Sequence, residues 1–207
     1  MLKAFIVDGD QYGTARYLQQ YGDMEIIDDH VSADLFVYTG GEDISTMFYN
    51  EDPVYAYSKG ISRRDRVEQE AFTYAIKHSK YQFGICRGHQ LLWALNGGLL
   101  WQDLAQHGRH GHDVHLKDGS VIRGVTSLHH QAARIVVPDE EDFILGVTLE
   151  PQGVTARSQH AEERLNSVVE VMYIPGARCF GVQGHPEFAG ASDQFRRYVI
   201  NHIKETI

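Results

Sequence analysis

The stretch "GICRGHQ", residues 84–90, decides the fold of this chain, because it places a cysteine between two glycines where an apolar run ends. The run "YQFGI" before Cys86 is typical of a buried strand, and residues 88–95 are typical of a helix. A sharp turn from a strand into a helix crowds the residue at its apex, and flanking glycines relieve that crowding. We therefore expect the Cys86 side chain to point out above the carboxyl ends of the strands, where open α/β sheets bind ligands.

The chemistry of Cys86 has two readings at this point. In one, the helix that begins near Gly88 points its positive end at the sulfur and favours the thiolate, which is the nucleophilic form. In the other, Cys86 is a small buried side chain that happens to lie between two glycines and has no role in catalysis. A nucleophilic thiol also needs a base and a group that orients the base, so these partners decide between the two readings.

A histidine and a carboxylate that fit these roles occur in "GVQGHPEF", residues 181–188. His185 follows a predicted strand, and Glu187 lies two positions later, on the same side of an extended segment. Pro186 fixes the backbone between them. The carboxylate can then hold the imidazole in the tautomer that accepts a proton from sulfur. The alternative is a surface turn with no role in catalysis.

Strands and helices alternate over the first hundred residues. Short apolar runs that end in turn residues predict strands at residues 3–9, 24–28, 34–41 and 81–85. Helical spacing of apolar residues predicts helices between them, at residues 12–21 and 64–78. This order favours a parallel sheet covered on both faces.

The second half of the chain is richer in strands. Residues 113–125 predict a hairpin with a glycine in its turn, and further runs predict strands at residues 133–137, 167–174 and 179–184. A last helix is expected over residues 192–204. Because the sequence shows no internal repeat and no linker, we expect residues 1–207 to form one α/β domain. Its mostly parallel sheet would carry helices on both faces and an added β-hairpin region.

The composition excludes several classes of function. With 28 acidic and 19 basic residues, the formal net charge is −9, which disfavours nucleic acid as a partner. No apolar run reaches the roughly 18 residues that cross a bilayer, and we see no secretory signal, so we expect no membrane association. Two cysteines make no disulfide framework. Free thiols then favour a cytoplasmic location.

Together these motifs resemble the class I glutamine amidotransferase superfamily, which has a flavodoxin-like fold, and within it the γ-glutamyl-γ-aminobutyrate hydrolase-like enzymes (peptidase C26). Five segments carry the resemblance in the family's order: "TGGEDISTMFY", "RDRVE", "GICRGHQLLWALNGGLLWQDL", "SLHHQAA" and "GVQGHPEF". The order of nucleophile, histidine and carboxylate also separates this chain from the α/β-hydrolases, in which the acid precedes the histidine.

The resemblance implies a role for each residue of a site. Cys86 would be the nucleophile, His185 the general base and acid, and Glu187 the carboxylate that orients the imidazole. The backbone N–H groups of Gly41 and Arg87 would form the oxyanion hole, where removal of one donor typically costs on the order of 3 kcal/mol of transition-state stabilisation. On the substrate side, the resemblance implies Gly40, Gln90, His130 and Gln131.

For two other groups of residues, a purely structural role is possible or expected. Arg64, Asp65 and Glu68 match a family motif, or they form a solvated helix face with a salt bridge. Cys179, on the strand that leads to His185, is expected to pack in the core. Thr39 stands where the family often has proline, so we expect a less rigid loop before Gly40 and Gly41.

A run of histidines, "HGRHGHDVH" at residues 107–115, invites a metal-binding reading. It contains His107, His110, His112 and His115. No cysteine or carboxylate constellation in the sequence completes a ligand set. The family reaction, moreover, needs neither a metal nor a cofactor. We therefore expect no metal site here.

The leading functional hypothesis is a free-standing hydrolase of small-molecule γ-glutamyl amides, which releases glutamate and an amine through a γ-glutamyl thioester. The alternative is a glutaminase subunit that supplies ammonia to a synthetase on a separate partner chain, because these 207 residues are accounted for by one domain. A third hypothesis is a non-catalytic binding protein of the same fold. The presence of Cys86, His185 and Glu187 together argues against this third hypothesis.

Overall fold

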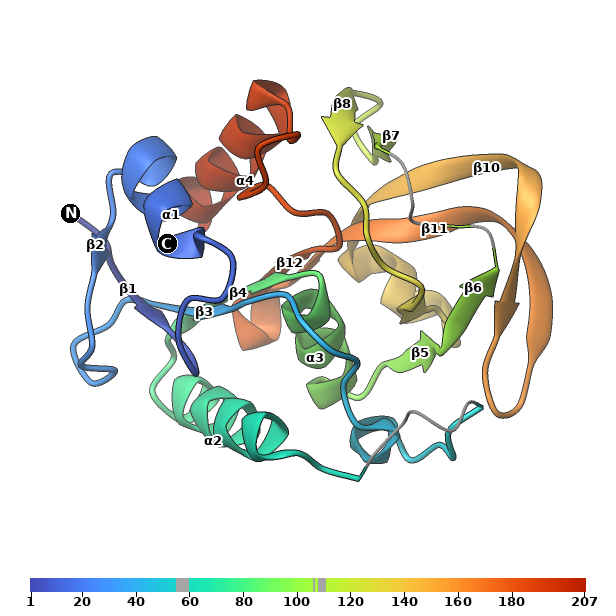
Figure 1. Ribbon diagram of the computed structural model, residues 1–207, viewed down its shortest axis with the longest axis horizontal. Coiled ribbons are helices and arrows are strands. Elements are labelled where there is room, and N and C mark those ends of the chain that lie inside the picture. The colour runs from blue at the N-terminus through green and yellow to red at the C-terminus, as the bar shows by residue number, and fades with distance from the viewer. Residues whose placement is uncertain (55–59, 106, 108–110) are drawn as a thin grey trace.

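The computed structural model describes residues 1–54, 60–105, 107 and 111–207. Their centre is a ten-stranded sheet with the strand order β2-β1-β3-β4-β12-β11-β10-β7-β8, and β6 pairs with β10 off this path. A separate two-stranded sheet joins β5 and β9. Helices cover both faces of the large sheet (Figure 1). The predicted α/β fold class is therefore confirmed.

The strands of the first half are β1 (Lys3–Ile6), β2 (Glu25–Ile26), β3 (Leu35–Tyr38), β4 (Tyr81–Ile85), β5 (Leu99–Trp101) and β6 (Asp103–Ala105). Those of the second half are β7 (His112–Leu116), β8 (Val121–Val125), β9 (Ala132–Arg134), β10 (Ile144–Arg157), β11 (Glu162–Ile174) and β12 (Cys179–Val182). The α-helices are α1 (Thr14–Gly22), α2 (Arg63–Lys77), α3 (Arg87–Leu95) and α4 (Asp193–Thr206). Short 3-10 helices lie at Thr46–Tyr49, Pro138–Phe143 and Pro175–Ala177. Among the helices of the described residues, none combines the length and the apolar character that a membrane crossing needs.

The large sheet has a parallel and an antiparallel part. The neighbours β2, β1, β3, β4 and β12 pair in parallel, as the alternation of strands and helices predicts. Beyond β12, the strands β11, β10, β7 and β8 pair antiparallel. β7 and β8 form the predicted hairpin. The carboxyl ends of the parallel strands therefore meet at one edge, which is where the sequence places its candidate site.

Alternate residues of each central strand point to opposite faces and feed two apolar cores. On β3, Leu35 and Val37 pack under α1 and α4, whereas Phe36 and Tyr38 pack under α2 and α3. Because both faces are covered, the strand reads as a continuous apolar run rather than as an alternating one. Full burial of an apolar side chain of this size contributes roughly 1.5–3 kcal/mol to stability.

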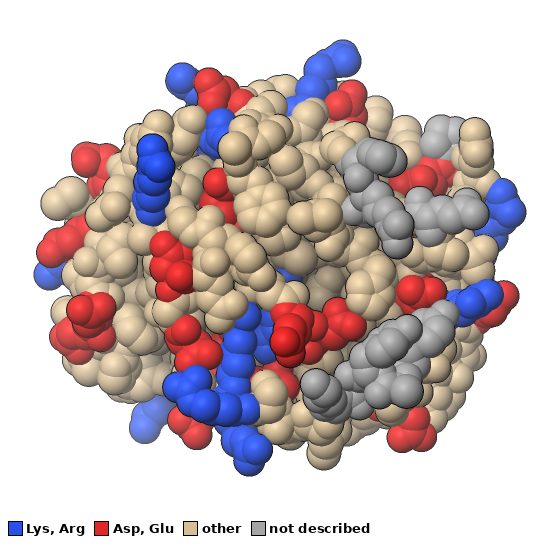
Figure 2. Space-filling model, in the orientation of Figure 1, with Lys and Arg blue, Asp and Glu red and all other residues tan. Residues whose placement is uncertain are grey.

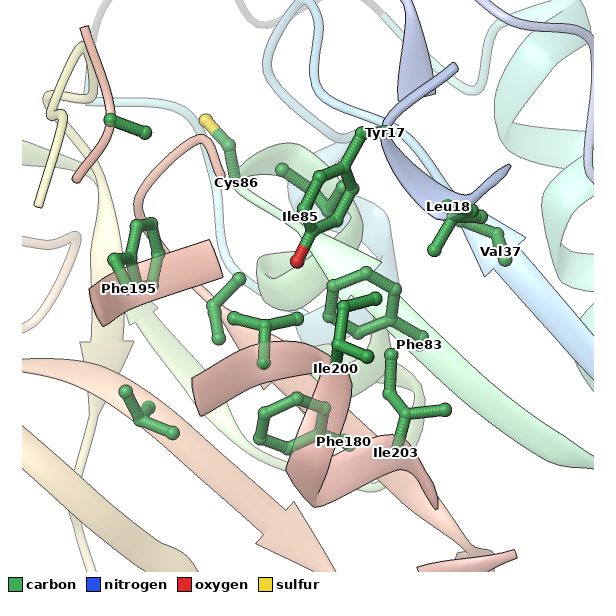
Figure 3. Packing of buried hydrophobic residues seen from close by; sticks show 14 of the residues in the cluster. Tyr17, Leu18, Val37, Phe83, Ile85, Cys86, Phe180, Phe195, Ile200 and Ile203 are labelled. Atoms are coloured by element: carbon green, nitrogen blue, oxygen red, sulfur yellow. The ribbon is translucent and has the colours of Figure 1, made fainter. Parts of the chain in front are cut away.

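The core under α1 and α4 reaches up to the candidate nucleophile. Figure 3 shows Phe83 and Phe180 lying against Ile200 and Ile203 of α4. The rings of Phe83 and Phe180, which come from neighbouring strands, stack with centroids 5.5 Å apart. Cys86 belongs to the edge of the same cluster. The turn that carries Cys86 is thus supported from below by closely packed side chains.

Several sequence-based element predictions differ from the structure. The strands β5, β6 and β10 were not predicted, and β10 contains Gly146 and Gly153 at shifts in the β10–β11 register. The run at residues 133–137 was predicted as one strand, but β9 ends at Arg134. The first helix begins two residues later than predicted, because Gly13, with φ 79°, is its N-cap.

Close packing at the start of α3 fixes how this helix leaves the sheet. A Cβ on Gly84 would overlap the backbone carbonyl of Gly88, and a Cβ on Gly88 would overlap the carbonyl of Tyr38 on β3. Glycine at both positions therefore lets the first turn of α3 lie directly on β3 and β4. The two glycines relieve crowding, as the sequence predicts, and they do so through contact with neighbouring backbone.

We expect Gly88→Ala to lower the free energy of unfolding by about 3 kcal/mol, since a clash with backbone cannot be relieved by rotating a side chain. Gly176→Ala is the matched control, because a Cβ there meets nothing within 4 Å. Its effect should stay within about 0.5 kcal/mol. Urea unfolding of both variants measures the difference, and equal stabilities would contradict the packing argument.

Candidate active site

Cys86 lies at the apex of the turn between β4 and α3. Its backbone angles, φ 51° and ψ −105°, lie in a region that a non-glycine residue rarely adopts. The N–H of Cys86 donates to the carbonyl of Val182 on β12 at 2.8 Å, which ties the apex to the neighbouring strand. Figure 3 shows the sulfur turned away from the apolar side chains beneath it. The turn therefore presents the thiol at the carboxyl ends of the strands.

His185 and Glu187 follow β12 and form a hydrogen-bonded pair. Glu187 Oε1 lies 2.8 Å from His185 Nδ1, and the Glu187 side chain is fully buried. Thr126 fixes the backbone of His185, because its hydroxyl donates to the His185 carbonyl at 2.6 Å and accepts from the His185 N–H at 3.2 Å. Because Nδ1 faces Glu187, Nε2 is the ring nitrogen left for the neighbouring Cys86 thiol, which acts on the pKa of this ring.

The neighbours of His185 favour the protonated form of its ring. Burial acts to lower the pKa of His185, but the hydrogen bonds with Cys86 and Glu187 and the charge of these groups outweigh burial and raise that pKa to about 10. Phe188 stacks on the ring with centroids 4.1 Å apart, and Tyr12 meets it edge-on at 6.2 Å. A positively charged imidazole beside a sulfur favours the thiolate.

The loop after β3 brings Gly40 and Gly41 to the same centre. A Cβ on Gly40 would lie 2.7 Å from Cε1 of His185, so glycine is needed for this close approach. Gly41 has φ 148°, which L side chains rarely adopt, and a Cβ there would overlap the guanidinium of Arg64. A Cβ on Gly41 would also lie 3.4 Å from Cδ of Arg87. Both glycines therefore lie beside another residue predicted for the site, His185 or Arg87.

A buried ion network joins this loop to the turn at Cys86. Arg87 pairs with Asp65 at 2.6 Å and also with Glu68, which accepts from Arg64 at 2.8 Å. Arg64 donates to the carbonyl and the hydroxyl of Thr39 at 3.0 and 3.1 Å. Asp65 and Glu68 are 2% and 0% exposed, so the reading of a solvated helix face is wrong. The network links α2, α3 and the loop that contains Gly41.

On the predicted substrate side, Gln90 and Gln131 are in direct contact. The Gln90 amide donates to the backbone carbonyl of Gln131 at 3.0 Å and to the Gln183 side chain at 3.2 Å. All three residues are buried. Gln90 therefore ties the first turn of α3 to the segment that precedes β9. The Gln183 contact was missed by the sequence analysis, although this residue lies inside the quoted "GVQGHPEF" motif.

His130, also predicted for the substrate side, has a side chain that is 46% exposed. Its Nε2 is 3.1 Å from Asp43, and its Nδ1 is 3.5 Å from Asp103. The hydrogen bond with Asp43 is the main reason that the pKa of His130 is raised, although partial burial opposes the shift. His130 thus bridges the segment before β9 and the loop after Gly41, rather than joining the buried group around Gln90.

A cleft of about 830 Å³ lies beside the site, and its lining contains Gly41 and Arg87 but neither Cys86 nor His185. Its lining also contains Tyr12, Glu42 and Asp43. Figure 2 shows this face of the molecule, where basic and acidic side chains are interspersed around a hollow near the centre. The cleft therefore offers partners of both charge signs to a small polar ligand.

The remaining cysteine and the histidine run lie away from this cleft. Cys179 packs in the core under α2 and α3, as predicted, and burial raises the pKa of its thiol to about 12. Of the run, His110 lies outside the described residues. His107 and His112 turn toward Glu170 on β11, a carboxylate that the sequence analysis did not associate with them.

The chain has recognisable relatives in sequence. A model of the peptidase C26 family matches residues 10–187. Protein NtpR of Enterococcus hirae is 28% identical over 181 residues, which cover 77% of this chain and 69% of that protein. The putative glutamine amidotransferase-like protein YvdE of Lactococcus lactis subsp. lactis is 30% identical over 185 residues, which cover 80% of this chain and 71% of that protein.

Solved structures share the fold. A putative GMP synthase protein from Thermoplasma acidophilum aligns with a TM-score of 0.58 and 20% identity over 99% of this chain and 96% of that one. PurLQS from Thermotoga maritima aligns with a TM-score of 0.59 and 18% identity over 98% of this chain and 99% of that one. At these identities the likeness concerns the fold alone.

We expect the His185 imidazole to lose its proton near pH 10 in an NMR titration of the folded protein. Cys86→Ala and Glu187→Gln each remove one partner that stabilises the imidazolium, so each variant should titrate at lower pH. The unfolded chain has a histidine pKa of about 6.5. The protonated ring therefore stabilises the fold fully below about pH 6.5, and this contribution is lost as pH rises through about 10.

His202 serves as an internal control, because burial alone lowers its pKa to about 4 and neither variant touches it. Its titration should stay unchanged in both variants. A wild-type His185 that titrates near pH 6.5, or one that both substitutions leave unmoved, would contradict the electrostatic description of the site.

Proposed function

The chain belongs to the peptidase C26 family, and from this premise we propose that it hydrolyses the γ-glutamyl amide bond of small molecules through a thioester on Cys86. Family membership supports an amide hydrolase or a glutamine amidotransferase in general. The γ-glutamyl substrate and the roles of single residues are the proposal.

The observation that supports this proposal best is the placement of Cys86 beside His185, whose ring is hydrogen-bonded to Glu187. It combines a thiol on a strained turn, a histidine that can hold or release a proton, and a buried carboxylate that fixes the ring. A nucleophile, a base and an orienting acid in contact are the parts that covalent catalysis by a thiol requires.

In the first half of the proposed reaction, the Cys86 sulfur attacks the γ-carbonyl carbon of the substrate while the His185 imidazolium stays beside it. The carbon–sulfur bond forms, and the carbonyl oxygen takes up the negative charge. When this intermediate collapses, the carbon–nitrogen bond breaks and the amine leaves with the proton that His185 Nε2 donates. Glutamate then remains bound to Cys86 as a γ-glutamyl thioester.

In the second half, the now neutral His185 accepts a proton from water, and the resulting hydroxide attacks the thioester carbonyl. The carbon–sulfur bond breaks, glutamate leaves, and the Cys86 thiolate and the His185 imidazolium are restored. Glu187 keeps the ring in one orientation throughout, because its hydrogen bond occupies Nδ1. The net reaction consumes one water and needs no cofactor.

The oxyanion of both steps would be held by the backbone N–H groups of Gly41 and Arg87. Arg87 is the first residue of α3, so its N–H is free of the helical ladder and lies at the positive end of the helix. Gly41 sits in the loop that the ion network of Arg64, Glu68 and Arg87 ties to α3. The network thereby keeps the two proposed donors at a fixed separation.

The cleft contains acidic and basic side chains that could bind the charged end of a γ-glutamyl group. The far end of this group carries an α-ammonium and an α-carboxylate, so its recognition needs partners of both signs. The lining of the cleft provides the acidic Glu42 and Asp43 and the basic Arg63. We also propose a cytoplasmic location, because a nucleophilic thiol works where cysteines are kept reduced.

A glutaminase subunit is the second candidate. The observation that favours it is the fold shared with a putative GMP synthase protein and with PurLQS. The same thioester chemistry on glutamine would release ammonia, which a separate synthetase chain would consume. The two candidates differ in the leaving group: a free hydrolase must accept a substituted amine, whereas a glutaminase subunit releases only ammonia.

We expect the purified protein, without a partner, to release glutamate from at least one γ-glutamyl amide of a substituted amine. Its kcat/KM for that substrate should exceed the value for glutamine about tenfold, which is roughly 1.4 kcal/mol of differential transition-state binding. Coupled detection of glutamate over a set of γ-glutamyl amides makes this measurement. Cys86→Ala should abolish the release, and Cys179→Ala, a change in the core, should retain most of it.

Other outcomes separate the candidates. Hydrolysis confined to glutamine, slow alone and faster with a co-purifying synthetase, would establish the glutaminase subunit instead. A folded protein that releases glutamate from none of these amides would support the non-catalytic binding protein.

A further inference from the structure

A second group of ionisable side chains lies apart from Cys86, around Glu170 of β11. Glu170 is 1% exposed, and both of its carboxylate oxygens are buried. The Nε2 atoms of His107, His112 and His129 lie 3.6, 3.2 and 3.3 Å from one of these oxygens, Oε1. We refer to these four residues as the Glu170 cluster. Nothing in the proposed reaction uses them.

Outer contacts fix the tautomers of two of the histidines. Nδ1 of His107 lies 2.8 Å from Glu150 Oε1, and Nδ1 of His129 lies 2.8 Å from the Gln131 carbonyl. Both partners are acceptors, so each Nδ1 carries a hydrogen and donates it. In a neutral ring, Nε2 then presents a lone pair, and both Nε2 atoms lie within 3.6 Å of Glu170 Oε1. Metal-ligating histidines show this arrangement, with the second ring nitrogen donating to a carboxylate or a carbonyl.

The distances fit a small divalent ion. The Nε2 atoms of His107 and His129 are 3.1 Å apart, and they lie 3.6 and 3.3 Å from Glu170 Oε1. A tetrahedral zinc ion with bonds of about 2.0–2.1 Å requires ligand atoms about 3.3 Å apart. The ligand atoms of His107, His112 and Glu170 also lie within 4.8 Å of one another. His112 can thus supply a further ligand.

Hydrogen bonding within the cluster is incomplete. Within the described part of the chain, both oxygens of Glu170 and the Nε2 atom of His112 are buried and lack a hydrogen bond of normal geometry. Buried polar atoms in proteins nearly always have a partner. The Nε2 atoms of His107 and His129 lie within hydrogen-bond range of each other, which leaves the Glu170 carboxylate without a donor. A cation between the rings and this carboxylate, either a proton or a metal ion, would satisfy it.

We propose that His107, His112, His129 and Glu170 form a structural site for a divalent transition metal, with Zn²⁺ as the best match. Imidazole nitrogens with a carboxylate oxygen suit zinc and its neighbours rather than magnesium or calcium, which prefer oxygen ligands alone. Four protein ligands would close the coordination shell, as in structural rather than catalytic zinc sites. The expectation of no metal at the histidine run overlooked Glu170, because it lies more than fifty residues later in the chain.

The ion would link three segments of the chain to β11. His107 lies between β6 and β7, His112 begins β7, and His129 lies between β8 and β9, a segment that runs over β11 in Figure 1. The Gln131 carbonyl accepts from both His129 and Gln90. A metal ion on His129 would therefore stabilise the segment that contains Gln131, which Gln90 contacts. It would do so without contacting Cys86.

The test uses the 207-residue chain, stripped with a chelator and titrated with Co²⁺ and then Zn²⁺. We expect one equivalent of Co²⁺ to give the visible absorption of a tetrahedral site, Zn²⁺ to displace it, and either metal to raise the melting temperature. Glu170→Gln should weaken binding about a hundredfold or more, because it removes the charged ligand and keeps the shape. His115→Gln, a neighbour of His112 outside the cluster, should bind as the wild type does.

Two further variants control for misfolding and for metal binding at the Cys86 thiol. His112→Gln changes the least buried member of the cluster, so it reports on the site if Glu170→Gln fails to fold. Cys86→Ala should keep the tetrahedral Co²⁺ spectrum, which separates this site from metal capture by the thiol. Absence of a stoichiometric tetrahedral spectrum, or equal affinity in wild type and both cluster variants, would overturn the proposal and leave a protonated histidine–carboxylate cluster. Because the readout is metal binding, it does not depend on amide hydrolysis.

Discussion

The reversal of the backbone at Cys86 is the constraint on which the rest of the site depends. A non-glycine residue holds φ 51° and ψ −105° there because the surrounding structure leaves no alternative. Gly84 and Gly88 let α3 start directly on the sheet, and the Cys86 N–H is anchored to Val182 of β12. As a result, one turn fixes the place of the thiol, the direction of α3 and the distance to the segment that carries His185.

The buried ion network extends this constraint to the loop after β3. Burial of charges such as Asp65, Glu68 and Arg87 seldom adds net stability, because desolvation offsets the attraction between them. What such a network provides is a fixed geometry, since removal of one partner leaves an uncompensated buried charge. Here it joins α2 to α3 and, through Arg64, to the backbone of Thr39. At Thr39, where the family often has proline, hydrogen bonds from Arg64 thus hold the backbone in place.

The sequence sufficed for the features that depend on local pattern. The strand β4, the turn at Cys86 and the helix α3 follow from a buried apolar run, two glycines and helical spacing, and the structure places them where they were expected. The hydrogen bond between His185 and Glu187 also follows from their spacing of two residues. These parts are predictable because each one is determined within a few residues of chain. The approach of His185 to Cys86, which lies far earlier in the chain, was implied only by the family resemblance.

Features that depend on distant contacts were missed. β10 holds Gly146 and Gly153 only because pairing with β11 absorbs the register shifts, and neither strand signals this alone. Residues 135–137 have the composition of a strand, yet they lie outside β9 and are exposed to solvent. Glu170 sits in an apolar run, and only the fold brings three histidines to it. Burial of Arg64, Asp65 and Glu68 was likewise undecidable from a helix with so many charges.

In the proposed reaction, Cys86 carries a γ-glutamyl group during turnover. This intermediate can be trapped by rapid acid quenching of the protein with a γ-glutamyl amide, followed by mass spectrometry of the digested peptides. We expect a single glutamyl adduct on the peptide that contains Cys86, formed within the first turnover and removed by neutral hydroxylamine. Release of glutamate with no adduct on Cys86, or an adduct on the peptide that contains Cys179, would contradict it.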